Sequence, residues 1–455
     1  MNAQPDGADA TSAAPRSGPI WGRVAITCLA PALAEWLCPK VPLPGLDHAH
    51  LALTFPELAA SERLSAFALW LSPVLSAFLL VELVALCVPR WRSLRNGGPQ
   101  GRGRLLTATW KLALALAAVQ AWGLAVYLER MGLLADGARL SRLLVVLSLV
   151  AGTCSFVVLA RWLDVAGLGG GFSVLALFGF LRPGAFGDLD AAFAGALAEP
   201  SKALPAVAVA ALACAATVLL LRGRRRDPQG RPSPVRLPAC GIVPFQQAAA
   251  MPAFVAAGAS LGLWSLASSS FGSSDGLGAM AFRAALTVAL ACVWSVVFNL
   301  PANVVALDVR AAQPADAAGQ RQVHADLRWA LLWSAAYTLA LGLADWLVPA
   351  QLDLAPALNV LLVAVATAVT LDVVAEARAR RRLGDLEPVW PEHRLYAVDR
   401  VLATLEQAGI PAFPRSANHR ALWHVFAPFI PIQILVPSAR AREASELLHE
   451  RFATR

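Results

Sequence analysis

Charged residues are scarce in this chain. They make up 15% of its 455 residues, whereas a soluble domain carries about 25%. The mean hydropathy is +0.58, and apolar runs recur along the sequence between short polar loops. Crossing a hydrocarbon layer of about 30 Å takes about 20 such residues in a helix. One soluble core cannot bury all of these runs, so we expect a polytopic membrane protein.

Paired cysteines and metal-binding patterns are also missing. The seven cysteines stand singly in or beside apolar segments, with no CxxC motif and no histidine at a zinc-ligand spacing. We expect inert buried thiols, no disulfide framework, no metal and no cofactor. The glycines from Gly167 to Gly171 follow no predicted strand, so they indicate a tight turn between two spans and not a phosphate-binding loop.

The N-terminus lacks the basic segment of a signal peptide. Residues 1–18 are polar and rich in Ala, Ser, Pro and Asp, so we expect an uncleaved, disordered cytoplasmic tail. The net charge of +8 does not indicate nucleic acid, because the arginines gather in short loops beside apolar runs. That distribution is the one that the positive-inside rule describes.

Apolar periodicity predicts ten membrane spans. They lie at 19–38, 65–89, 108–128, 143–163, 171–187, 203–221, 239–264, 283–306, 328–348 and 356–375. Arginine-rich loops alternate with loops that carry less positive charge, which places the arginine-rich loops and both termini in the cytoplasm.

Four ionisable residues lie in or at the edges of these spans: Glu82, Arg161, Asp345 and Asp372. Such residues usually face the interior of a helix bundle or a water-filled cavity. Arg161 and Asp345 are near span ends, so for them a side chain that reaches out to the membrane surface is the alternative.

The hydropathy changes near the C-terminus, where residues 386–455 predict a small cytoplasmic α+β module. The expected elements are a helix at 393–407 that stops at Gly409, strands at 410–413 and 426–436, and a closing helix at 439–452. This module contains no catalytic or metal-binding cluster, and we expect His419 and His424 on its surface.

Polar residues and glycines occupy fixed places among the apolar residues of the second and third spans. The stretch reads SAFALWLSPVLSAFLLVELV, then PRWRSLRNGGPQGRGR, then ALALAAVQAWGLAVYL. It resembles the SecY family pattern FALGIxPYIxAS, its GxxGR loop and its third span with a glutamine. The matching positions are Phe67, Ala68, Leu69, Pro73, Ser76, Ala77, Gly98, Gly101, Arg102, Gln120 and Gly123.

Further blocks follow in the order of that family. AGTCSFVVLARWLDVAGLGGG at 151–171 resembles AGTxxxxWLGE followed by GIGNG, and PVRLPACGIVP at 234–244 resembles LPLKVNxAGVIP. FNLPANVVALDV from Phe298 is similar to fNPxdvAxnL, and PLPGLD at 42–47 is similar to IPIPGID. The resemblance covers about residues 20–385.

The resemblance implies an all-α clamshell of ten transmembrane helices over 19–385, in two inverted five-helix halves. The implied function is that of a protein-conducting channel subunit, not an enzyme. It would pass unfolded polypeptides across the bacterial inner membrane and release apolar segments sideways into the lipid bilayer. The implied partners are SecE-like and SecG-like small membrane subunits, signal-bearing preproteins, and a SecA-type ATPase or a ribosome.

The resemblance also assigns roles to residues. The implied pore constriction consists of Leu71, Leu75, Ala176, Phe180, Ile242, Gln246 and Val365. Leu71 and Leu75 share one helix face because they are four residues apart. The implied lateral gate includes Gln120 and Glu82. Basic residues expected to dock cytosolic partners are Arg222, Arg224, Arg225, Arg226, Arg236 and Arg321.

Several positions depart from the family pattern. Gln246 would wet an otherwise apolar constriction, and the segment 47–65, where the family has its plug helix, is shortened. Arg161 stands in place of an acidic residue, and AAQPADAAGQRQ replaces a GIRPG docking element. These departures predict a divergent channel. They leave open a specialised or regulatory SecY paralogue and, from another class, a secondary transporter with Glu82 and Gln246 as its intramembrane polar pair.

Overall fold

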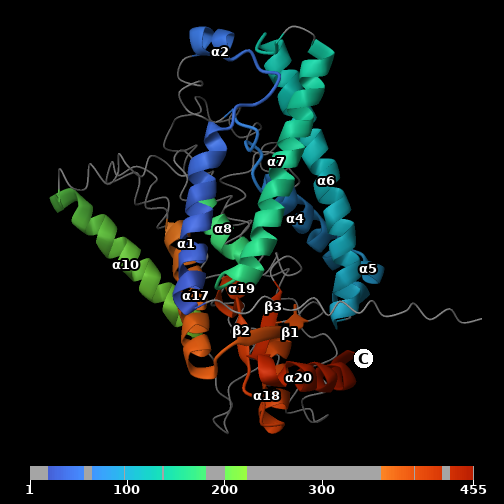
Figure 1. Ribbon diagram of the computed structural model, residues 1–455, viewed down its shortest axis with the longest axis vertical. Helices are drawn as coiled ribbons and strands as arrows, with labels where there is room; N and C mark the ends of the chain where they lie inside the picture. The colour runs from blue at the N-terminus through green and yellow to red at the C-terminus, as the bar shows by residue number, and fades with distance from the viewer. Residues whose placement is uncertain are drawn as a thin grey trace, which may run out of the picture.

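Figure 1 shows the computed structural model of the chain, a bundle of long helices with a small mixed module at one end. The structure describes residues 19–55, 64–96, 98–135, 138–180, 200–222, 360–393, 395–422 and 431–453. Within these ranges, helices stand at seven of the ten predicted spans. The other three, at 239–264, 283–306 and 328–348, lie outside the described residues, so the total of ten stays a prediction.

The helices of the bundle are apolar along most of their length. They are α1 (Ile20–Leu37), α4 (Ser72–Cys87), α6 (Gly98–Arg130), α7 (Ala138–Ala166), α8 (Gly171–Phe180), α10 (Pro200–Arg222) and α17 (Val360–Leu383). The stretches Ile20–Lys40, Gly101–Arg130 and Arg139–Ala166 are long and apolar enough to cross a membrane. The expected arginine-rich loop before α6 is instead helical, as α5 (Pro89–Asn96) and the first turns of α6.

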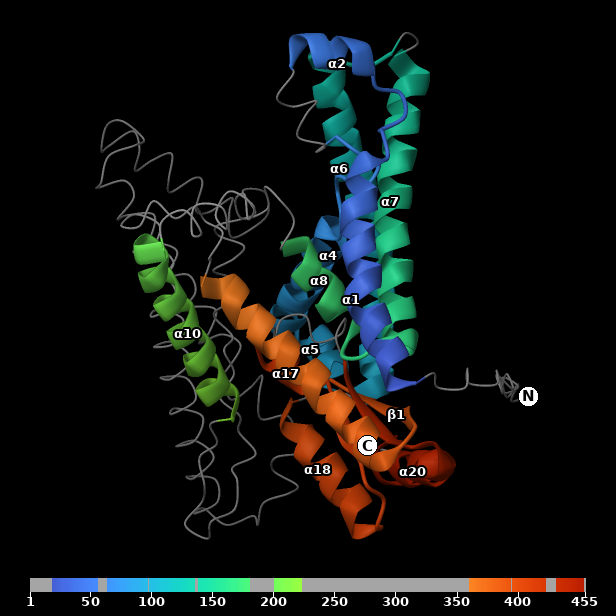
Figure 2. The same ribbon diagram turned by 60° about the vertical axis from the view of Figure 1, so that its left-hand side comes forward.

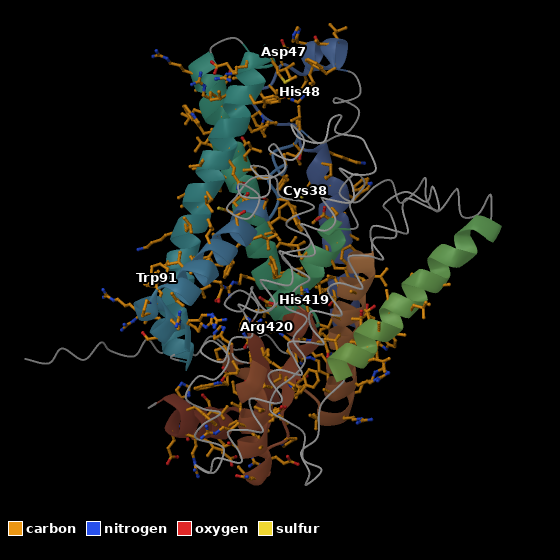
Figure 3. All side chains as sticks on the ribbon, turned by 180° about the vertical axis from the view of Figure 1, so that it is seen from behind. Cys38, Asp47, His48, Trp91, His419 and Arg420 are labelled. Carbon is orange, nitrogen blue, oxygen red and sulfur yellow. The ribbon has the colours of Figure 1, made fainter. Side chains whose placement is uncertain are left out.

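A short helix, α2 (His48–Thr54), lies at the end of the bundle that is remote from the module (Figures 1 and 3). Asp47 caps it by accepting a hydrogen bond from the His50 N–H at 2.9 Å. Gly45 has φ +87°, and a Cβ there would lie 2.6 Å from the Ser141 carbonyl oxygen. The glycine and aspartate of PLPGLD therefore serve a turn that fits closely against α7.

Gly152 of the AGT block allows α7 to contact the chain just before α4. A Cβ at this position would lie 2.2 Å from the carbonyl oxygen of Ala66 and 3.2 Å from the Cα of Phe67. Because backbone atoms cannot rotate away as a side chain can, only glycine fits here without moving a helix.

Gly152→Ala is therefore expected to lower the free energy of unfolding by about 1–3 kcal/mol, the usual effect of overpacking. Gly123→Ala in α6 is the matched control, since its Cβ would meet nothing within 4 Å. Unfolding of both purified variants by SDS in mixed micelles measures the effect. Equal stabilities would contradict the close approach of α7 to Ala66.

The C-terminal module is a three-stranded antiparallel sheet with helices. Its elements are β1 (Leu386–Glu392), α18 (Leu395–Gln407), β2 (Phe413–Arg415), α19 (Ala417–Leu422), β3 (Ile432–Pro437) and α20 (Ala441–Leu448). The strand order is β1-β3-β2. Buried side chains such as Trp390, Val401 and Ile434 form its core, which is separate from that of the bundle.

The module differs from the sequence prediction in detail. Strand β1 and helix α19 were not expected, and β2 begins later than the expected strand at 410–413. Pro388 and Pro391 conceal β1 in the sequence, and both are tolerated because β1 is an edge strand with an irregular register at Pro388. Gly409, with φ +67°, follows α18 where a helix stop was expected.

Candidate functional site

Four positions of the expected pore constriction come together in one apolar cluster. Leu71 at the start of α4, Ala176 in α8 and Val365 in α17 are fully buried in it. Leu75, one turn after Leu71, is partly buried against the same cluster. Figure 2 shows α4, α8 and α17 in the same region of the bundle. The described positions of the site are therefore apolar and buried or partly buried.

The structure does not describe the side chains at the three other expected constriction positions. Phe180 ends α8, but its side chain is outside the description, and Ile242 and Gln246 lie outside the described residues. The wetting expected from Gln246 stays a prediction.

The turn before α4 adds a residue that the sequence did not indicate. Trp70 has φ +47°, a conformation that is uncommon outside glycine, and it directly precedes Leu71. A Cβ at Gly179 would lie 2.0 Å from the Trp70 ring. Gly179 of α8 thus makes room for the indole beside the expected constriction. Strained backbone of this kind is common at functional sites.

The two expected lateral-gate residues are far apart. Glu82 in α4 is ion-paired with Arg102 of α6. Gln120 follows Arg102 by 18 positions on the same helix, which is about 27 Å at 1.5 Å per residue. Gln120 is half-buried, and a gate role for either residue stays a prediction.

Glu82 is the centre of a buried ion cluster. Its carboxylate accepts a hydrogen bond from Arg95 Nε of α5 at 2.6 Å and one from Arg102. All three side chains are less than 5% exposed. Arg420 of the C-terminal module also attracts this carboxylate electrostatically. The cluster ties α4, α5 and α6 together at the end of the bundle nearest the module.

The ion cluster explains why the GxxGR motif has a glycine and an arginine next to each other. A Cβ at Gly101 would lie 2.3 Å from the Leu94 carbonyl oxygen, so the glycine lets α6 approach α5. The following residue, Arg102, supplies one of the two guanidinium groups on Glu82. The motif therefore builds the link between the second and third spans.

A second buried ion cluster joins α17, the α7–α8 turn and the module. Glu376 of α17 accepts hydrogen bonds from Gly169 N at 2.7 Å, Arg380 Nε at 2.9 Å and Arg415 Nε at 2.8 Å. Arg415 also donates through Nη1 to the Asp164 carbonyl oxygen at 2.7 Å. The sequence offered one signal, the Glu376–Arg380 pair at a spacing of four. Nothing in the sequence indicated Arg415.

Asp372 is buried one turn before Glu376 and binds the start of α19. Its carboxylate accepts hydrogen bonds from the Asn418 N–H and side-chain amide, both at 3.0 Å, and from the His419 N–H at 2.8 Å. Asp372 is buried, but it faces helix α19 of the module, whereas the interior of the helix bundle or a water-filled cavity was expected.

The expectation that His419 lies on the surface is wrong. His419 is fully buried, because its own N–H binds Asp372 and α19 is thereby held against α17. Figure 3 places His419 and Arg420 at the junction between the bundle and the module. Burial, together with the positive charge of the neighbouring Arg420, lowers the pKa of His419 to about 3. His424 lies outside the described residues.

Neutral His419 makes the docked module sensitive to acid. Its pKa is about 6.5 when the chain is unfolded and lower when folded, so protons favour unfolding below about pH 6.5. Between pH 7.5 and 5.5 the wild type is expected to lose about 1.4 kcal/mol more stability than His419→Gln. Asp372 and Glu376 are present in both proteins, so the difference isolates His419. Parallel unfolding curves at both pH values would contradict its burial as a neutral group.

The remaining expected residues have mixed outcomes. Arg161 is exposed on α7, with its guanidinium 5.8 Å from the Trp110 ring centroid, which agrees with the outward alternative. Arg222 ends α10 and its side chain is outside the description. Asp345 and the other docking arginines, Arg224, Arg225, Arg226, Arg236 and Arg321, lie outside the described residues. Among the described residues, no group of three His, Cys, Asp or Glu side chains could hold a metal ion.

The long apolar helices, packed around a buried apolar cluster, indicate the class of polytopic membrane proteins. Comparison with solved structures agrees on the fold. A SecY protein whose plug domain stabilises the closed translocation channel aligns with a TM-score of 0.50 at 11% identity, over 80% of this chain and 92% of that one. Sec61 of the canine ribosome-channel complex aligns with a TM-score of 0.51 at 12% identity, over 80% and 93%.

The chain belongs to the SecY family, whose model matches residues 65–314. It is 28% identical over 291 residues to protein translocase subunit SecY of Pseudomonas aeruginosa, covering 57% of this chain and 63% of the relative. It is 31% identical over 207 residues to the Vibrio cholerae subunit, covering 41% and 46%. These matches span less than two thirds of each relative's length.

Proposed function

We propose that this chain is a divergent channel subunit of a protein translocase in the bacterial cytoplasmic membrane. The convergence of Leu71, Ala176 and Val365 from three helices on one buried apolar cluster carries the proposal. An apolar constriction excludes ions by staying dry, whereas an extended polypeptide can displace its side chains. Such transport makes or breaks no covalent bond, so an enzymatic role is not part of the proposal.

The proposal includes the sideways release of apolar segments into lipid and partnership with SecE-like and SecG-like subunits. Family membership supports both. A SecA-type motor or a ribosome would drive polypeptides from the side on which the module lies, with both termini in the cytoplasm. The altered loop that should present GIRPG makes the motor contact a point of divergence.

A specialised or regulatory paralogue is the second candidate, and the docked module favours it. Arg415, Asn418 and His419 bind the bundle through buried or partly buried hydrogen bonds. The secondary transporter is less well supported, because two arginines already occupy the carboxylate of Glu82 that would bind a solute.

Depletion of the chain in its native host tests the proposal. A general accumulation of signal-bearing precursors, measured by pulse labelling, supports a housekeeping channel. Accumulation of one precursor class supports the specialised paralogue. Normal export of all precursors after depletion would rule out both.

A further inference from the structure

The module contacts α17 and the α7–α8 turn of the bundle, and only α17 is its neighbour in the sequence. The module follows α17 directly, since β1 begins three residues after α17 ends. Its contact with α17 is therefore a contact between neighbours. Its contact with the α7–α8 turn is different, because Arg415 and Asp164 are 251 positions apart.

We propose that the segment from Arg415 to Arg420 is a clasp that bonds α17 and the α7–α8 turn at the same time and thereby restricts opening of the channel. The effect on channel opening rests on the proposed channel function. The existence of the clasp rests only on the contacts between the module and the bundle.

Arg415 makes the bridge through three separate nitrogens. Its Nε and Nη2 bind the carboxylate of Glu376 on α17, and its Nη1 binds the Asp164 carbonyl oxygen at the end of α7. Both ionised side chains are nearly inaccessible to solvent. A lysine could not copy this geometry, because a guanidinium presents several donors in a fixed plane.

Glu376 reinforces the bridge from the other side. While it binds Arg415, its Oε2 also accepts the Gly169 N–H of the α7–α8 turn. Separation of α17 from this turn must therefore break a main-chain hydrogen bond and a charge-assisted one together. The groups that lose these hydrogen bonds are buried and ionised, so the loss opposes the movement.

The bundle has a matching adaptation at Gly170. In the family pattern GIGNG an asparagine stands at this position, whereas this chain reads GLGGG. A Cβ at Gly170 would lie 2.7 Å from Ser416 Oγ. Ser416 has φ +63°, a conformation that non-glycine residues rarely adopt. Glycine in place of asparagine thus opens the space that the clasp fills.

Arg420 extends the clasp toward α4. It donates through Nη2 to the His393 carbonyl oxygen at 3.0 Å, and its charge attracts the carboxylate of Glu82. The clasp therefore bonds directly to the ion cluster on α17 and acts only through its charge on the cluster that joins α4, α5 and α6.

The test measures the separation of α7 and α17 in the full chain, reconstituted in lipid nanodiscs with its seven cysteines replaced by serine. Spin labels are attached at Val158→Cys on α7 and Val374→Cys on α17, both exposed positions. Pulsed electron paramagnetic resonance should give one narrow distance distribution. Arg415→Gln should add a population at longer distance.

Two further variants guard against misfolding and nonspecific effects. Gly170→Val places a side chain against Ser416, the neighbour of Arg415, from the bundle side, and should give the same longer population. Arg442→Gln is the matched control, because Arg442 pairs with Glu446 on the exposed face of α20; its distribution should equal the parent's.

Unchanged distances in both Arg415→Gln and Gly170→Val would overturn the clasp. This result does not depend on export. If the labels separate while depletion leaves export normal, the clasp stands and the proposed function falls. If export requires the chain while the distances stay fixed, only the clasp falls.

Discussion

Glu376→Gln is expected to destabilise the protein by about 3–5 kcal/mol, the usual effect of removing one partner from a buried ion pair. The glutamine has nearly the same shape, but it leaves the guanidinium groups of Arg380 and Arg415 in a buried site without their counter-charge. It also weakens the acceptor of the Gly169 N–H. Unfolding in mixed micelles, followed by tryptophan fluorescence, measures the loss.

Glu446→Gln is the control for that measurement, since Glu446 and its partner Arg442 are exposed on α20. Its stability should match the wild type, because exposed ion pairs contribute little. If the two variants were equally stable, Glu376 would not be the buried junction between α17 and the module.

Glu82→Gln is expected to produce a loss of similar size, about 3–5 kcal/mol, at the other ion cluster. Arg95 and Arg102 would then share a buried site with a neutral amide. Arg102→Gln alone is also expected to destabilise, because Glu82 would keep a single guanidinium in contact.

A double-mutant cycle over Glu82 and Arg102 isolates their interaction. The double variant Glu82→Gln, Arg102→Gln should be more stable than the sum of the two single losses predicts, because neither unpaired charge of that pair remains. Strict additivity of the two losses would contradict a direct buried ion pair.

Local periodicity predicted much of the helical bundle. The apolar runs of α6 and α7 are long enough to fix both helices from the sequence, and the fixed glycines of the family blocks marked the close contacts. The sequence could not show why a glycine is needed at each position, because the reason is a contact with another segment of the chain. Gly152 faces the carbonyl oxygen of Ala66, and Gly101 faces that of Leu94.

The contacts of the module were the least predictable part of the structure. His419 is a polar residue in a polar segment, so a surface position was expected. It is buried, because its main-chain N–H binds Asp372, 47 positions away, and holds α19 against α17. Arg415 resembles any other basic residue of a polar segment until Glu376 is placed beside it. Such long-range pairs leave no periodic trace, so local patterns cannot indicate them.

The constriction residues were predicted by resemblance, and their role in a pore stays a prediction. Leu71, Ala176 and Val365 come from separate helices and meet in one apolar cluster. Trp70 was missed because its role depends on a left-handed backbone conformation and on the empty space at Gly179.

Site-specific photocrosslinking of a translocating polypeptide tests the central claim most directly. A photoreactive amino acid at Leu75, beside the buried cluster, is compared with one at Leu147, which is exposed on the outside of α7. Membrane vesicles receive a precursor that is stalled halfway by a folded domain. The account predicts crosslinks from position 75, none from position 147, and none with a precursor that lacks its signal sequence. Equal crosslinking from both positions, or none from position 75 while the precursor is engaged, would contradict a path through this constriction.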